Sequence, residues 1–291
     1  MVRKIRNFLK TRKEKIIFGL CLGISILIGA FFILRETQFL PQNAIVLLEN
    51  VVLPGQNDTV LIFAPHQDDE TLGAGGYIIR AVENKANVYI VLITNGNSRN
   101  LETKRNIEFQ KITKFLGVPN SHLLYLNLPD GQLSKQDLFM IQQDITHTIK
   151  QVDPDIIIYP IPQDRHIDHQ ISGKIIEHTL GYFPQIKSYA YLVHYPGFPR
   201  PEGLHRNAFI LPPLSMLSIN KRWETLNLTL DEENKKCAAI YLYRTQFQNP
   251  LPFLRNLMVA FCRQNEIFLT NREYYGIIYI RTIKMWVFID F

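Results

Sequence analysis

Five apolar runs of strand length lie between residues 58 and 196, and helical segments separate them. The runs are TVLIFA, NVYIVLIT, HLLYLNL, DIIIYP and SYAYLV, and each of the first four is followed by a stretch of helical character. Strands that are apolar throughout are typical of a parallel sheet with helices on both faces. With right-handed connections, the sequence predicts an α/β fold with a Rossmann-like, doubly wound, mostly parallel sheet.

Three further segments carry more limited expectations. The stretch SKQDLFMIQQDITHTIKQV predicts a helix over 134–152 with Ser134 as its N-cap. Residues 224–247 are expected to form a strand followed by a helix. Residues 274–291 are apolar but interrupted by Arg281 and Lys284, which favours strands or a hairpin over a membrane span.

The N-terminal region has a different character. Residues 16–34 are 19 uncharged residues, and a helix of that length measures about 29 Å, close to the hydrocarbon core of about 30 Å. Residues 1–15 hold seven Lys/Arg and one Glu, which favours a cytoplasmic N-terminus. We therefore expect a single-pass membrane protein with a basic cytoplasmic tail at 1–15, a transmembrane helix at 16–34, a linker at 35–57 and an extracytoplasmic domain at 58–291. A cleaved signal peptide is the alternative.

Charge and cysteine content argue against a nucleic-acid partner and against a thiolate metal site. The formal net charge of +6 belongs to the first 15 residues, because the rest of the chain holds 25 basic and 25 acidic residues. A nucleic-acid partner is not expected, since it would need a basic face on the domain itself. A thiolate metal site is not expected either, because Cys237 and Cys262 do not form a CxxC pair. Whether these two cysteines pair with each other stays open.

Two clusters of histidine and carboxylate follow the first and fourth apolar runs. APHQDDE occupies 64–70, and PQDRHIDHQ occupies 162–170. Because ligands of open parallel sheets bind outside the carboxyl ends of the strands, we expect these clusters to meet at one edge of the sheet. Carboxylates crowded together repel one another unless a cation compensates. Imidazole and carboxylate without thiolate suit Zn²⁺ or another divalent first-row metal.

These motifs also resemble those of a known family. PHQDDE resembles the [AP]-H-x-D-D-[ED] motif of the N-acetylglucosaminyl-phosphatidylinositol de-N-acetylase family, also called PIG-L or LmbE-like. HIDH resembles the second motif of that family, H-x-D-H. TNGN, KRNIE, LGV, LNLPDGQL and KKCAAIYLYRTQ are similar to further segments of it, so that the resemblance covers about residues 58–270.

The resemblance implies roles for the matching residues. His66, Asp69 and His169 match the zinc ligands of the family. Asp68 matches the general base, and His166 matches the histidine that stabilises the oxyanion or protonates the leaving amine.

Four other residues are expected near the site. Asp168 is expected to orient a ligand imidazole. Arg105 and Asp130 match substrate-contacting positions of the family, and His194 ends a strand on the same edge of the sheet. Gln67 stands where the family more often has proline, and it is expected to point away from the metal.

The implied function is a metal-dependent N-deacetylase, a hydrolase that cleaves an amide by attack of zinc-bound water. Its expected partner is an N-acetylglucosamine-type sugar, glycolipid or glycan. Two alternatives remain open from the sequence: a deacylase of another N-acylated metabolite, and a noncatalytic glycan-binding module of the same fold.

Overall fold

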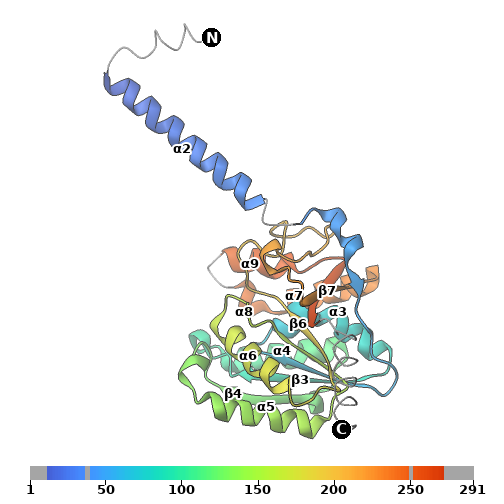
Figure 1. Ribbon diagram of the computed structural model, residues 1–291. Helices are drawn as coiled ribbons and strands as arrows, with labels where there is room; N and C mark the ends of the chain where they lie inside the picture. Colours follow the sequence, from blue (N-terminus) through green and yellow to red (C-terminus); the bar gives the residue numbers. More distant parts are fainter. Residues whose placement is uncertain (1–11, 37–39, 249–251, 272–291) are drawn as a thin grey trace, which may run out of the picture.

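The computed structural model of the chain describes residues 12–36, 40–248 and 252–271 (Figure 1). Most of the basic tail predicted at 1–15 and the strands or hairpin expected at 274–291 lie outside the described residues. The helices that the structure describes are α2 (Arg12–Glu36), α3 (Asp69–Glu83), α4 (Glu102–Leu116), α5 (Leu138–Val152), α6 (Ile167–Leu180), α7 (Leu230–Leu242), α8 (Arg244–Phe247) and α9 (Pro252–Ala260). The short 3₁₀ helices are η1 (Gln42–Leu47), η2 (Ser98–Asn100), η3 (Asn120–His122), η4 (Leu133–Lys135) and η5 (Leu214–Met216).

The strands of the described residues form one sheet in the order β1-β7-β8-β6-β5-β2-β3-β4. Neighbouring strands are parallel except where β8 pairs with β6 and β7. The doubly wound, mostly parallel sheet predicted from the sequence is therefore confirmed. The strand bounds are β1 (Glu49–Asn50), β2 (Thr59–Ala64), β3 (Asn87–Thr94), β4 (Leu123–Leu128), β5 (Ile156–Pro160), β6 (Lys187–Tyr191), β7 (Lys221–Asn227) and β8 (Asn265–Asn271).

The two central strands mark the point where the chain changes direction across the sheet. From β2 the chain proceeds through β3 to β4, and it then returns to place β5 on the other side of β2. Strands β2 and β5 are parallel, so their carboxyl ends open into the same crevice, where open α/β sheets bind ligands. Both strands are buried along almost their whole length, which explains their continuous apolar runs.

The helices divide between the two faces of the sheet, as the topology requires (Figure 1). Helices α5 and α6 pack against each other on one face, whereas α3 contacts α4 and α7 on the other. Helix α3 begins at Asp69, so that Asp69 and Glu70 lie in its first turn. Two residues of the first polar cluster are therefore fixed by a helix.

The cap of α5 differs from the prediction. Asp137 caps this helix, because its carboxylate accepts the backbone N–H groups of Phe139 and Met140. Ser134 instead lies in η4. Aspartate and serine are comparably good N-caps, so the sequence could not decide between the two positions.

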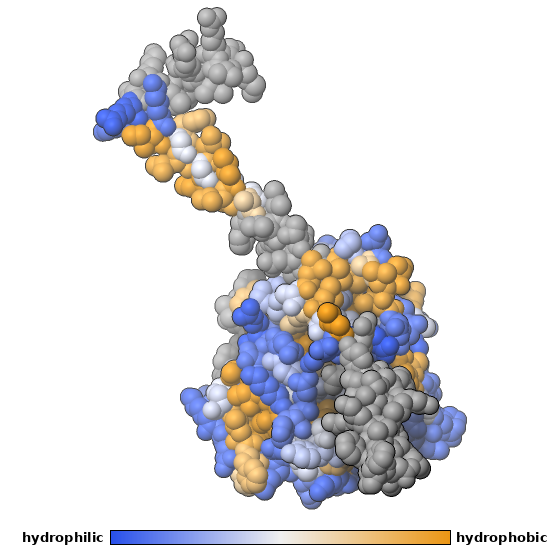
Figure 2. All heavy atoms as spheres, viewed as in Figure 1, coloured by the Kyte–Doolittle hydropathy of each residue, from blue (hydrophilic) through white to orange (hydrophobic). Residues whose placement is uncertain are grey.

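Helix α2 forms where a transmembrane helix was predicted, and Figure 2 shows its apolar side chains exposed. Within the described ranges, no helix is long and apolar enough to cross a membrane. The predicted transmembrane helix at 16–34 and the single-pass membrane localisation are therefore wrong, and the membrane as a partner is not supported.

The pairing of the two domain cysteines, which the sequence left open, has an answer. Cys237 of α7 and Cys262, which follows α9, form a disulfide with their Cα atoms 5.1 Å apart. The bridge joins α7 to the segment that leads into β8.

Candidate metal and active site

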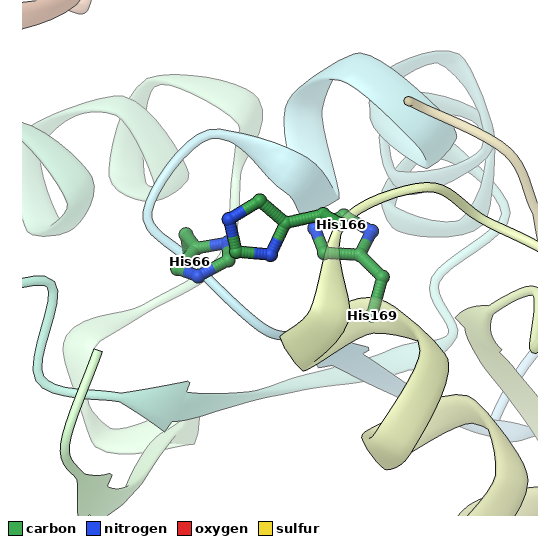
Figure 3. Close-up of side chains that lie close together, drawn as sticks. All are labelled: His66, His166 and His169. Carbon is green, nitrogen blue, oxygen red and sulfur yellow. The ribbon is translucent and has the colours of Figure 1, made fainter. Parts of the chain in front are cut away.

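The two polar clusters meet at the carboxyl ends of β2 and β5. His66 lies in the loop after β2, His166 is the N-cap of α6, and His169 lies in the first turn of α6. Figure 3 shows their three imidazole rings grouped together. The ring centroids of His66 and His166 are 4.5 Å apart, and those of His66 and His169 are 5.4 Å apart.

One carboxylate oxygen lies between two of these imidazoles. Oδ2 of Asp69 is 3.2 Å from Nδ1 of His66 and 3.0 Å from Nε2 of His169. All three side chains are buried. The structure therefore places the three predicted metal ligands side by side, with the carboxylate of Asp69 between the two imidazoles.

The outer nitrogen of each imidazole faces a second aspartate. Nε2 of His66 is 3.1 Å from Oδ2 of Asp168, and Nδ1 of His169 is 3.3 Å from Oδ2 of Asp164. Metal-binding histidines commonly contact a carboxylate through the nitrogen that does not bind the metal, which fixes the ring orientation. Asp168 therefore lies where it was expected. Asp164 has the same relation to His169, and the sequence assigned it no role of its own.

Both outer aspartates are held by backbone N–H groups. Asp168 accepts those of Gly131 at 2.7 Å and Leu133 at 3.1 Å. Asp164 accepts the N–H groups of Val193 at 3.1 Å and His194 at 2.8 Å through one oxygen, and that of His166 at 2.8 Å through the other. These bonds tie the site to the loops after β4 and β6.

The buried atoms of the cluster fit a divalent cation. Among the described residues, neither ring nitrogen of His169 has a properly aligned hydrogen bond, although a carboxylate lies close to each. Buried polar atoms without a partner are unusual and require an explanation such as an ion. Three sets of side chains have possible ligand atoms within 4.8 Å of one another: His66, His166 and His169; Asp69, His169 and His194; and His66, Asp130 and Asp168.

The electrostatics of the cluster also favour positive charge. Burial lowers the pKa of His169, but Asp69 and Asp164 outweigh it and raise that pKa to about 9. Burial also lowers the pKa of His66, but hydrogen bonds to Asp130, Asp168 and Asp69 outweigh burial and raise that pKa well above its usual value. The carboxylates therefore stabilise a cation here, and a metal ion would take the place of these protons.

Asp68 lines the cavity in front of the cluster, with an unusual backbone. Its φ of 135° lies in a region that favours glycine, and its N–H donates to Oε2 of Glu70 at 3.2 Å. Glu70 is buried, and it accepts the hydroxyl groups of Thr71 at 2.6 Å and of Tyr243. Burial and the neighbouring Asp69 raise the pKa of Asp68 to about 8. A carboxylate with a raised pKa is a stronger base than an ordinary aspartate.

His166 is arranged to donate a hydrogen bond. Its Nδ1 accepts the backbone N–H of Asp168 at 3.3 Å, which places the proton of the neutral ring on Nε2. Burial and the neighbouring His66 and His169 lower the pKa of His166 to about 4, so the ring is neutral at pH 7. A neutral imidazole with Nε2–H can donate to an oxygen that gains negative charge.

Arg105 and Asp130 form a polar wall beside Asp68. Nη1 of Arg105 lies 3.5 Å from Oδ2 of Asp130, and its Nη2 lies 3.9 Å from Oδ2 of Asp68. Oδ1 of Asp130 is also 3.2 Å from Nε2 of His66. Gln67 points away from the cluster, because its amide nitrogen donates to Oδ1 of Asn106 at 2.7 Å.

A cavity of about 220 Å³ lies in front of the histidine and aspartate cluster. Asp168 and His169 lie behind its wall, whereas Gln246, Leu254, Leu257 and Met258 close it from the side of α8 and α9. The sequence placed none of these four in the site, because no strand end or motif spacing brings α9 to the edge of the sheet. The predicted residues that line the cavity are His66, Asp68, Asp69, Arg105, Asp130, His166 and His194.

Comparison with known proteins confirms the family resemblance. Residues 61–180 match the family model described as GlcNAc-PI de-N-acetylase, PIG-L. A diacetylchitobiose deacetylase of Thermococcus kodakarensis is 25% identical over 126 residues, which are 39% of this chain and 46% of that protein. The match thus spans about half the length of this curated relative.

Solved structures share the fold. The N,N'-diacetylchitobiose deacetylase of Pyrococcus horikoshii gives a TM-score of 0.54 at 20% identity, over 76% of this chain and 85% of that one. The zinc-inhibited form of the teicoplanin deacetylase Orf2 gives a TM-score of 0.55 at 14% identity, over 74% of this chain and 99% of that one. At these identities the similarity concerns the fold alone.

Proposed function

Since residues 61–180 form a PIG-L family domain, we propose that this chain is a metal-dependent hydrolase that removes the N-acetyl group from an N-acetylglucosamine-type sugar conjugate. The observation that carries the proposal is the position of Asp69 Oδ2, which lies between Nδ1 of His66 and Nε2 of His169 at the edge of a cavity. The similarity to the diacetylchitobiose deacetylase of Thermococcus kodakarensis supports the reaction type and the sugar class.

In the proposed site, His66, Asp69 and His169 hold the ion, and the imidazole and carboxylate donors favour Zn²⁺. Such an ion, when bound, acidifies water and polarises a carbonyl group. Asp164 and Asp168 keep the two imidazoles in the orientation that binding requires.

The residues at the front of the cavity carry the proton transfers. Asp68 takes the proton of the attacking water, a role for which its position in the cavity wall suits it. His166 donates Nε2–H to the acetamide oxygen as that oxygen gains negative charge. The carbon–nitrogen bond then breaks, the proton that Asp68 took from water passes to the leaving amine, and acetate is released.

Acetate release from N-acetylglucosamine, diacetylchitobiose and alkyl glycosides of N-acetylglucosamine by the purified, zinc-loaded chain tests the proposal. We expect Asp68→Asn to lower kcat about 10²–10⁴-fold while the metal stays bound. Asp144→Asn, a matched change of an exposed aspartate on α5, should leave the rate unchanged. Acetate release that is insensitive to Asp68→Asn and to a chelator would contradict the proposal, as would a zinc-loaded protein that releases no acetate.

A further inference from the structure

A second cavity adjoins the one in front of the metal cluster. It measures about 380 Å³, and it shares His194 and Leu257 with the catalytic cavity. The loop after β6 forms one side of it, and α9 forms the other. The two cavities therefore adjoin at His194 and Leu257, and a group attached to a substrate in the catalytic cavity has this space beside it.

The walls of this second cavity are mostly apolar. Phe198 and Ala260 are only 4% and 2% exposed, whereas Phe253 is 61% exposed at the rim. Tyr195 completes the aromatic lining, and the guanidinium of Arg165 lies 5.9 Å from the centre of its ring. Apart from Tyr195, the polar side chains of the lining are those of Arg165, His194, Glu202 and Asn256. Hydroxyl groups that enter the apolar remainder would lose water and meet few hydrogen-bonding partners.

A third cavity, on another side of the catalytic one, has the opposite character. It measures about 330 Å³, and it shares Ser98, Asp130 and His166 with the catalytic cavity. Asn95, Asn97 and Gln132 add further polar groups to its wall. Side chains of this kind suit the hydroxyl groups of a sugar.

The two flanking cavities differ in polarity, so each suits a different part of a substrate. We propose that the polar cavity receives sugar hydroxyl groups and that the apolar cavity between the β6 loop and α9 binds an apolar aglycone. The preferred substrate is then an N-acetylated sugar that carries an alkyl or acyl chain, not a free sugar or a plain oligosaccharide. This inference rests on the proposed function for the position of the sugar, but the binding of the chain is measurable without turnover.

The apolar chain should contribute to affinity in proportion to the length that the cavity covers. Burial of one methylene contributes about 0.8 kcal/mol, which corresponds to about a fourfold gain in affinity. Affinity should therefore rise with each added methylene and level off once the cavity is filled.

Calorimetric titration of the Asp68→Asn protein, which binds without consuming its ligand, tests this dependence. The ligands are the methyl, butyl, hexyl and octyl glycosides of N-acetylglucosamine, used below their micelle concentrations. We expect a gain of about threefold to fourfold for each methylene that enters the cavity. Equal affinities for the methyl and octyl glycosides would overturn the inference, as would tighter binding of diacetylchitobiose than of the octyl glycoside.

Two variants locate the effect. Phe253→Ala should lower the affinity for the octyl glycoside about tenfold and leave that for the methyl glycoside unchanged. Phe139→Ala is the matched control, because Phe139 is 64% exposed on α5. Asn256→Trp, which narrows the cavity instead of widening it, should also remove the chain-length gain. A gain that survives both Phe253→Ala and Asn256→Trp would contradict the proposed location.

The binding and turnover assays separate the two proposals. A chain-length gain without acetate release from any glycoside supports the apolar cavity and contradicts the deacetylase function. If all four glycosides release acetate and bind with equal affinity, the result supports the deacetylase function and contradicts the proposed role of the apolar cavity.

Discussion

Oδ2 of Asp168 lies 3.1 Å from Nε2 of His66, on the side of the ring that faces away from Asp69. Asp168 is itself fixed by the backbone N–H groups of Gly131 and Leu133. Asp168 therefore contacts His66 from a fixed position, and we propose that it orients this ring for the ion. Carboxylates in this position commonly contribute 10–100-fold to metal affinity.

Asp168→Asn should accordingly weaken zinc binding by about 10–100-fold, because the amide cannot support His66 as a carboxylate does. Competition with a chromogenic chelator gives the affinity. Asp144→Asn serves as the control, since Asp144 is exposed on α5 and distant in sequence from both motifs. An unchanged zinc affinity in Asp168→Asn would show that this carboxylate does not orient a ligand.

Tyr243 and Glu70 hold the backbone of Asp68. The hydroxyl of Tyr243 donates to Oε1 of Glu70, and Oε2 of Glu70 accepts the N–H of Asp68. Tyr243→Phe removes a hydrogen bond to a buried carboxylate, so we expect the free energy of unfolding to fall by about 1.5–3 kcal/mol. Because Asp68 has a φ that favours glycine, kcat should fall as well, with little change in KM.

Urea denaturation and steady-state kinetics measure these two effects. Tyr241→Phe is the matched control, because Tyr241 lies two residues earlier, on α7, but is 47% exposed. A Tyr243→Phe protein that loses stability at full kcat would limit Tyr243 to a structural role.

Lys236 and Glu266 form a buried brace behind α3. Nζ of Lys236 lies 2.6 Å from Oε1 of Glu266 and donates to the backbone oxygen of Leu72 at 3.0 Å. Glu266 also accepts the backbone N–H groups of Gly76 at 2.6 Å and Tyr77 at 2.9 Å. The pair thus joins α7 and β8 to the helix whose first turn carries Asp69.

Lys236→Met should destabilise the protein by about 3–5 kcal/mol, because it leaves the carboxylate of Glu266 buried without its cation. The double variant Lys236→Met/Glu266→Gln removes both charges, and we expect it to be more stable than Lys236→Met alone. Thermal unfolding followed by circular dichroism measures both, with Lys235→Met, a change at the more exposed neighbouring residue, as the control. If Lys236→Met unfolds at the same temperature as the control, the brace does not contribute to stability.

The sequence predicted the sheet and the meeting of the two motifs because both depend on local patterns. The buried strands β2 and β5 are continuous apolar runs, and parallel strands bring their carboxyl ends to one edge. His66, Asp69 and His169 follow from that rule together with the family motifs. Their outer partner Asp168 was also expected from the chemistry of ligand histidines.

Features that depend on distant packing were not predictable. The position of Asp164 depends on hydrogen bonds from backbone N–H groups of the loop after β6, and no sequence motif indicates these bonds. The α9 wall of the cavity comes from a segment far from both motifs in the sequence. The hydrogen bond from Tyr243 to Glu70 likewise joins residues that are 173 positions apart. The predicted membrane span at 16–34 was inferred from the length of an uncharged segment and the charges beside it, and the described helices do not support it.

The metal content of the purified protein tests the central claim most directly. After loading with Zn²⁺ and removal of excess ion, mass spectrometry should find about one zinc per chain in the native protein, as expected for a single site. His169→Ala should retain less than about a tenth of that amount, since it removes one of three ligands. His147→Ala, which changes an exposed histidine on α5, should retain all of it. Full zinc content in His169→Ala, or none in the native protein, would contradict the proposal that the loops after β2 and β5 hold a metal ion together.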